Sequence, residues 1–129
     1  MVAANKRPVI CRSLELIERG RGVRFVVRRR GEVTPAFAVR FNGIAHAYLN
    51  RCAHRSLELD WVSGEFFDAF GEHLLCATHG ARYIPASGAC VGGPCHGAGL
   101  VKLPLVEKNG QILLESGNDI HLVDSEDVA

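Results

Sequence analysis

The chain has 129 residues, with 15 basic and 14 acidic side chains and a formal net charge of +1. This length suits one domain over residues 1–129 with a modest hydrophobic core. The balanced charge gives no reason to expect a nucleic acid or an anionic membrane as a partner, and no apolar run approaches the roughly 18 residues that span a bilayer. Because the first residues also lack the apolar segment of a signal peptide, we expect a cytoplasmic protein.

The first half of the chain is dominated by strand-like runs. Residues 12–20, RSLELIERG, are the only short helical candidate. Residues 22–33 contain a β-branched and aromatic run that ends at Gly31, and residues 36–50 contain two further runs joined by Asn-Gly at 42–43. Asn-Gly between alternating apolar residues predicts a β-hairpin, because both positions tolerate positive φ.

The central region differs in composition. Between Cys52 and Gly99 small residues, prolines, cysteines and histidines dominate, and only residues 64–70 and 72–76 look like strands. Loops of this composition usually hold a ligand, so we expect ligand-bearing loops at about residues 50–99. Four aromatic residues there are expected to form core between these loops: Trp61, Phe66, Phe67 and Phe70.

The last part of the chain returns to the hairpin pattern. Residues 103–115, LPLVEKNGQILLE, place a second Asn-Gly pair at 109–110 between two apolar runs. The tail from residue 116 is acidic at its end and is expected to fray. Together these patterns predict a small all-β protein of antiparallel strands with a ligand-bearing region inserted in its second half.

Four potential metal ligands occur in two short segments of the central region. Cys52 and His54 form C-x-H, and Cys76 and His79 form C-x-x-H after 21 intervening residues. Two thiolates and two imidazoles suit Zn²⁺, or a [2Fe–2S] cluster with two cysteines on one iron and two histidines on the other. Zinc fingers usually group like ligands, whereas each segment here supplies one of each. This favours the cluster, with a zinc-stabilised interaction module as the alternative.

The segments CAHRSLEL, CATHGARY and GGPCHG together resemble the three cluster loops of Rieske [2Fe–2S] proteins of the stand-alone ferredoxin type. The resemblance implies stacked antiparallel sheets with a small cluster-binding subdomain, and one [2Fe–2S] cluster per chain. It implies that Cys52 and Cys76 bind the inner iron and that His54 and His79 bind the outer, more exposed iron. Three further residues are expected around the cluster: Gly80, Tyr83 and Pro94.

The chain departs from the family pattern at several positions near these ligands. Leu57 and Thr78 stand where respiratory Rieske proteins have a loop-bracing disulfide, and Ala81 stands where they often have serine. Tyr83 replaces a phenylalanine that is frequent in the ferredoxin type; its hydroxyl either donates to a ligand sulfur or faces water. Without the serine and the disulfide, we expect a midpoint in the lower half of the range of about −150 to +300 mV.

The chain has five cysteines, an odd number that cannot all pair within it, and we expect it to stay in a reducing compartment. Disulfides are rare there, so a disulfide scaffold is not expected, and metal ligation or buried thiols explain the cysteines better. A disulfide between Cys90 and Cys95 is conceivable, but in a reducing compartment we expect them to be free thiols, and we expect Cys11 to be a small buried side chain.

The sequence contains no G-x-G-x-x-G fingerprint, so we expect no direct binding of NAD or flavin. Its 129 residues also leave no room for a second, catalytic domain of the kind that the larger Rieske oxygenases carry. We therefore expect no catalytic residues, and an electron carrier rather than an enzyme, passing single electrons from a reductase to a terminal oxygenase or other redox enzyme. A fixed small subunit of a larger oxidoreductase is the alternative. Three arginines beside the ligands form either a docking rim for an acidic partner or a solvated face: Arg51, Arg55 and Arg82.

Overall fold

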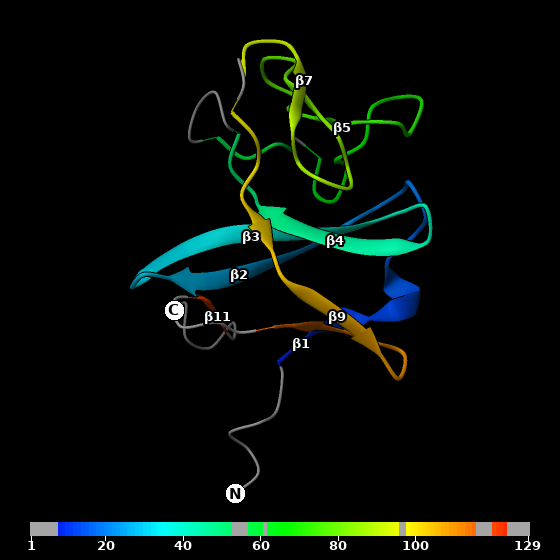
Figure 1. The fold of residues 1–129 in the computed structure, drawn as a ribbon, viewed down its shortest axis with the longest axis vertical. Coiled ribbons are helices and arrows are strands. Elements are labelled where there is room, and N and C mark those ends of the chain that lie inside the picture. Colours follow the sequence, from blue (N-terminus) through cyan, green and yellow to red (C-terminus); the bar gives the residue numbers. More distant parts are fainter. Residues whose placement is uncertain (1–7, 53–56, 61, 96–97, 116–119, 124–129) are drawn as a thin grey trace, which may run out of the picture.

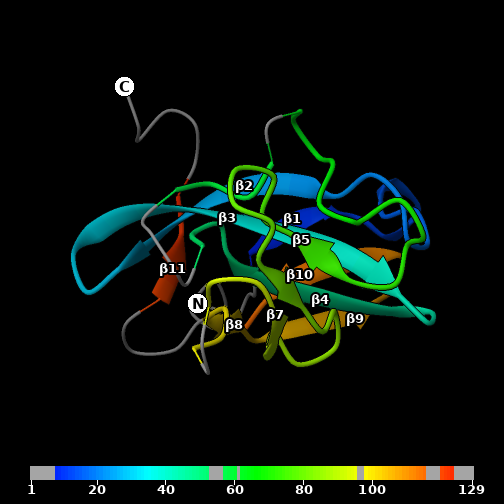
Figure 2. The same ribbon diagram turned by 90° about the horizontal axis from the view of Figure 1, so that it is seen from above.

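The computed structural model describes residues 8–52, 57–60, 62–95, 98–115 and 120–123. Strands lie in two tiers, a broad base of two sheets and a smaller upper part built from a third sheet and long loops (Figure 1). Seen from above, the small sheet lies over the central strands of the base (Figure 2). Within the described residues no helix is long and apolar enough to cross a membrane.

The central sheet of the base is antiparallel and has five strands. Its order is β11 (Ile120–Leu122), β2 (Val23–Arg29), β3 (Glu32–Phe41), β4 (Ile44–Leu49) and β8 (Lys102–Leu103). Strand β3 is the longest and pairs with both β2 and β4. It therefore holds the middle of the base together.

The other two sheets have three antiparallel strands each. The second sheet of the base has the order β1 (Val9–Arg12), β10 (Gln111–Leu114) and β9 (Leu105–Lys108), and the chain passes into it from β8 through Pro104. The upper sheet has the order β5 (Leu74–Leu75), β6 (Arg82–Tyr83) and β7 (Cys90–Gly92). The expected fold class, all-β with stacked antiparallel sheets and a small upper subdomain, is confirmed.

Both Asn-Gly hairpins are confirmed. Residues 42–43 connect β3 to β4 with φ of 54° and 80°, and residues 109–110 connect β9 to β10 with φ of 53° and 75°. Positive φ at both central positions is the backbone of a type I′ turn, whose twist matches that of the flanking strands. Residues 30–31, Arg-Gly, join β2 to β3 in the same way.

Three local expectations are wrong. The helical candidate at 12–20 forms only one 3₁₀ turn, Ser13–Glu15, because Leu16 turns extended and its side chain is buried. In the strand candidate at 64–70, Phe67 forms an isolated bridge to Leu74 instead of a continuous strand. The tail does not fray throughout, since β11 pairs with β2; residues 124–129 lie outside the described part.

The central sheet separates two hydrophobic cores because successive side chains of a strand point to opposite faces. From β3, Phe37 and Val39 enter the upper core, whereas Ala36 and Ala38 enter the lower one. Phe66 stacks on Phe37 in the upper core with ring centroids 3.9 Å apart. The upper core thus reaches from the base sheet into the loop region.

The expected aromatic core is only partly present. Phe66 is fully buried and Phe67 packs against the upper core, as expected. Phe70 is instead 83% exposed, because the turn closed by the backbone bond from Gly71 N–H to Asp68 C=O carries it outward. Trp61 lies outside the described residues.

Candidate metal centre

The two cysteines of the ligand segments meet in the upper core. Cys52 follows β4 and Cys76 follows β5, so separate elements bring them together. Cys52 is 2% exposed, Cys76 is 0% exposed, and both belong to the same cluster of buried side chains. His79 is exposed, and His54 lies outside the described residues.

The surroundings of the Cys76 thiol raise its pKa overall, so they disfavour a free thiolate that no cation stabilises. Burial raises the pKa of Cys76, and the adjacent Cys52 side chain raises it further. The backbone N–H groups of His79 and Thr78 donate toward the sulfur and lower the pKa. Two adjacent buried thiols are poorly solvated as thiolates, but a bound cation would offset that cost. The donor set therefore fits a metal centre.

Tyr83 connects the upper sheet to the Cys52 sulfur. Its side chain is fully buried, and its hydroxyl oxygen lies 3.3 Å from Cys52 Sγ. The hydroxyl therefore does not face bulk water, which was one of the two interpretations that the sequence allowed. A phenol O–H in this position can donate to a sulfur that carries negative charge.

Backbone hydrogen bonds hold the two ligand loops together. Ala77 N–H donates to the carbonyl of Leu59 at 2.9 Å, which joins the second loop to the end of the first. Within each loop, Cys52 N–H donates to Leu57 at 2.7 Å and Gly80 N–H donates to Cys76 at 2.8 Å. The loops are therefore braced by hydrogen bonds rather than by a disulfide between positions 57 and 78.

A buried polar network beside the first loop was not expected from the sequence. Asn50 Nδ2 donates to Asp60 Oδ1 at 3.0 Å, while Asn50 Oδ1 accepts from Leu59 N–H at 2.9 Å. Asp60 Oδ2 accepts from Gly64 N–H at 2.9 Å and lies 3.6 Å from Arg24 Nε. Asn and Asp are common in any turn, so nothing in the local sequence distinguishes these two as partners.

Arg82, one of the three arginines beside the ligand segments, forms an ion pair within the chain. Its Nη1 lies 2.6 Å from Asp68 Oδ2. Burial alone raises the pKa of Asp68, but N–H donors from Glu72 and His73 and the charge of Arg82 outweigh it, so the pKa is lowered. Arg82 thus positions the turn before β5 as well as facing solvent.

The third loop lies directly against the second. We call residues 92–95 the covering loop. Gly93 has φ of 79°, and a Cβ there would lie 2.8 Å from both Ala81 Cα and the Gly80 carbonyl oxygen. Only glycine allows this approach without displacing backbone atoms. Pro94 follows at a half-buried position, and Gly80, also with positive φ, forms part of the contacted surface.

Cys90 and Cys95 form a disulfide, so the expectation of free thiols is wrong. The turn through Gly92 and Gly93 brings the two Cα atoms to 6.0 Å, which is within the usual range for a disulfide. Cys11 is free and buried, as expected, and burial raises its pKa to about 11.

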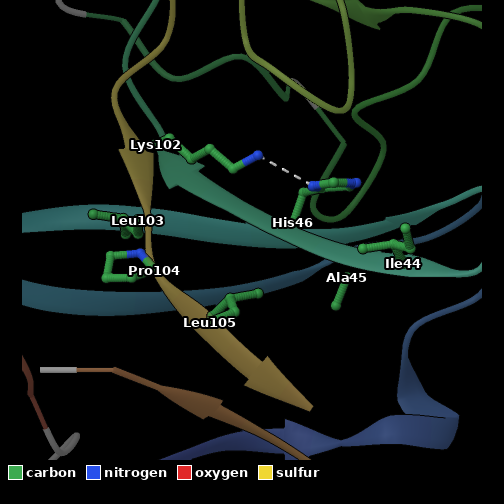
Figure 3. A pocket seen from close by; sticks show the side chains of 7 residues that line it. All are labelled: Ile44, Ala45, His46, Lys102, Leu103, Pro104 and Leu105. Carbon is green, nitrogen blue, oxygen red and sulfur yellow. Dashed lines mark hydrogen bonds between the residues drawn. The ribbon is translucent and has the colours of Figure 1, made fainter.

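A wide groove lies away from the ligand loops. It has a volume of about 520 Å³ and is open to solvent between β4 and the segment that runs from β8 into β9 (Figure 3). His46 and Lys102 face one another across its upper side, with Nδ1 and Nζ 3.4 Å apart. Burial and the Lys102 charge lower the pKa of His46. Its other lining side chains are apolar, and among the described residues no side chain of the ligand segments lines it.

Comparison with known proteins agrees with this geometry. The sequence pattern of the Rieske [2Fe–2S] domain matches residues 7–111. The chain belongs to the Rieske [2Fe–2S] family. Its cofactor is therefore a [2Fe–2S] cluster, and the chain carries the sequence and fold of an iron–sulfur electron-transport domain. Among curated proteins, none matches the sequence significantly.

Three solved structures show the extent of the shared Rieske fold. The ferredoxin of carbazole 1,9a-dioxygenase from Nocardioides aromaticivorans IC177 is 21% identical, with a TM-score of 0.65 over 85% of this chain and 97% of its own. The Sphingomonas yanoikuyae B1 ferredoxin is 17% identical, with a TM-score of 0.66 over 87% and 100%. The terminal oxygenase of the first system is 22% identical, with a TM-score of 0.66 over 89% of this chain but only 31% of its own.

Proposed function

We propose that this Rieske chain is a one-electron carrier between a reductase and a terminal oxygenase or another redox enzyme. When bound, a [2Fe–2S] cluster accepts and returns one electron. We further propose that Cys52 and Cys76 bind the inner iron and that His54 and His79 bind the outer iron. The observation that carries the proposal is the contrast between two adjacent buried thiols and an exposed histidine three residues beyond one of them.

This contrast gives each residue a separate task. The cysteines hold their end of the site inside the upper core, where water is excluded. His79 places an imidazole edge at the surface, where a protein partner can approach closely. The N–H groups of Thr78 and His79 and the Tyr83 hydroxyl point at the cysteine sulfurs, and such donors favour the more negative, reduced state.

The similar ferredoxin structures support the carrier role. The two ferredoxins are matched over nearly their whole length, whereas the oxygenase extends far beyond the matched part. We propose that this chain, like the two proteins named as ferredoxins, is an electron carrier. We further propose that it is a mobile cytoplasmic component that neither binds NAD or flavin nor transforms a substrate. The zinc-stabilised module is not carried forward, because the family holds an iron–sulfur cluster.

The test is a pair of matched cysteine substitutions. Cys52→Ser should abolish the visible absorption of the anaerobically purified protein and its bleaching by dithionite, because a serine hydroxyl is a poor ligand for iron in this family of sites. Cys11→Ser should keep both, because Cys11 lies in the lower core. Iron and zinc are assayed on the same samples. A Cys52→Ser protein with unchanged colour and iron would contradict the ligand assignment.

The carrier role itself is tested with the wild-type protein. A mobile carrier purifies without a large subunit and, when reduced, transfers its electron to an added Rieske oxygenase. Stable co-purification with a catalytic subunit would instead identify a fixed small subunit.

A further inference from the structure

Two cysteines that are not proposed cluster ligands lie beside the proposed ligands. Cys90 in β7 and Cys95 in the covering loop form a disulfide and are only five positions apart. Cys95 is 4% exposed and belongs to the same core cluster as Cys52 and Cys76. A redox-active sulfur pair therefore lies in the same packed unit as the proposed ligands.

This disulfide is connected to both ligand loops. Cys90 pairs with Tyr83 in the β6–β7 register, and the Tyr83 hydroxyl lies 3.3 Å from Cys52 Sγ. On the other side, the disulfide encloses Gly93, which lies directly against Gly80 and Ala81. The segment that the bond closes is thus the segment that contacts the C-x-x-H loop.

Three features of the disulfide favour reversible reduction. The closed segment is short, so the bond restricts the unfolded chain little compared with a long-range disulfide. Cys90 is half-buried whereas Cys95 is buried, so Cys90 is the more accessible of the two cysteines to an external thiolate. The carbonyl oxygen of Gly92 lies 3.7 Å from Cys90 Sγ and 3.2 Å from Cys95 Sγ, so it can accept a hydrogen bond from a thiol at either position.

We propose that Cys90 and Cys95 form a reversible dithiol–disulfide site that an external dithiol reduces, and that the oxidation state of this site sets how firmly the covering loop holds the C-x-x-H loop. The first half of the proposal is independent of the proposed function. The second half rests on it, because it assigns the C-x-x-H loop to the cluster.

The reaction is a two-step thiol–disulfide exchange. A thiolate of the external dithiol attacks Cys90 Sγ, which forms a mixed disulfide and breaks the Cys90–Cys95 bond. Cys95 leaves as a thiolate, takes up a proton and can donate to Gly92 C=O. The second thiol of the reagent, as a thiolate, then attacks the reagent's sulfur in the mixed disulfide. Cys90 leaves as a thiolate and takes up a proton. Two electrons and two protons pass to the protein, and the reagent becomes a disulfide.

The first experiment titrates the holoprotein anaerobically in dithiothreitol buffers of varied ratio of dithiol to disulfide. Samples are quenched in acid, alkylated under denaturing conditions and mapped by mass spectrometry. We expect labelling at Cys90 and Cys95 to rise together from none to complete and to reverse on reoxidation. The reduced protein should still unfold in one cooperative transition. A bond reduced only in denaturant, or thiols that never pair, would overturn the proposal.

The second experiment asks whether the disulfide restrains the neighbouring loop. Hydrogen exchange is compared between the oxidised protein, the dithiol form and Cys90→Ser/Cys95→Ser, with Cys11→Ser as a control that leaves the disulfide intact. We expect faster exchange around Gly80 and Ala81 and faster loss of iron to a chelator in the dithiol and double-serine proteins alone. Equal exchange and equal iron loss in all four would overturn the restraining role.

The two proposals can fail separately. Cysteine labelling and hydrogen exchange are also measured on the protein without metal, where neither readout needs a cluster. A reversible disulfide in a protein that never binds iron would uphold the sulfur site and refute the electron carrier.

Discussion

Tyr83 illustrates how one residue can link the packing of the core to the proposed redox centre. Its ring fills the upper core, and its hydroxyl lies beside Cys52 Sγ. Hydrogen bonds to a sulfur strengthen as the sulfur gains negative charge, so they stabilise the reduced state and raise the midpoint. Ala81 offers no hydroxyl, and we therefore still expect a midpoint in the lower half of the family range.

The Tyr83→Phe variant measures this contribution. Loss of a hydrogen bond that strengthens by about 1 kcal/mol on reduction would lower the midpoint by roughly 40 mV for a one-electron couple. The control is Tyr48→Phe, because Tyr48 is equally buried in the same core but donates to the Pro85 carbonyl at 2.6 Å. Midpoints are compared by dithionite titration. Equal shifts in both variants would show that the Tyr83 hydroxyl has no specific effect.

At the scale of elements, the upper part of the molecule has very short strands and depends on close loop contacts. Strands β5 and β6 have two residues each. Precise placement therefore depends on contacts such as Ala77 N–H to Leu59 C=O and the approach of Gly93 to Ala81. Loss of one such contact should displace a loop while the base sheets persist.

Adjacent glycines of the covering loop provide a matched test. Gly93→Ala places a Cβ 2.8 Å from backbone atoms at a positive φ, whereas a Cβ at Gly92 has no neighbour closer than 3.9 Å. We expect Gly93→Ala to lower the free energy of unfolding by about 1–3 kcal/mol and to speed iron loss. Gly92→Ala should stay within about 0.5 kcal/mol of wild type. Urea unfolding and iron release are measured on both; indistinguishable variants would contradict the role of this contact.

At the scale of the whole molecule, the acid stability should depend on Asp68. Its folded pKa is lowered, so it contributes stability above its unfolded pKa, and this contribution is lost as the pH falls through the folded value. Burial opposes the lowering of this pKa, but the N–H donors of Glu72 and His73 and the Arg82 guanidinium outweigh it. These contacts lie in the upper part, so their loss should weaken it first.

We expect Asp68→Asn to be less stable than wild type at pH 7. The difference should begin to shrink below about pH 4, where the carboxyl of the unfolded chain takes up its proton, and should disappear once the pH has fallen through the lowered folded pKa. The exposed Glu32→Gln substitution in β3 is the control and should follow wild type at both pH values. Urea unfolding at pH 7 and at pH 3 measures the differences. A gap that stays constant with pH would show that the Asp68 charge is not responsible.

What the sequence determined by itself was local. Asn-Gly turns need only the positive φ of two neighbouring residues, and C-x-H and C-x-x-H need only short spacing. The hairpins and the Rieske resemblance therefore follow from residues that are close together in the chain. The strand alternation likewise depends on neighbours along the chain and predicted the all-β class.

Only the tertiary structure decided contacts between residues that are distant in the chain or set by a turn. Asn50 and Asp60 are hydrogen-bond partners because the backbone at Leu59 folds back onto Asn50. Residues of the tail form strand β11 because they pair with β2. Cys90 and Cys95 bonded because Gly93, at a positive φ, lets the covering loop turn closely against the second ligand loop. Such pairings depend on where the whole backbone runs, and no local propensity encodes that path.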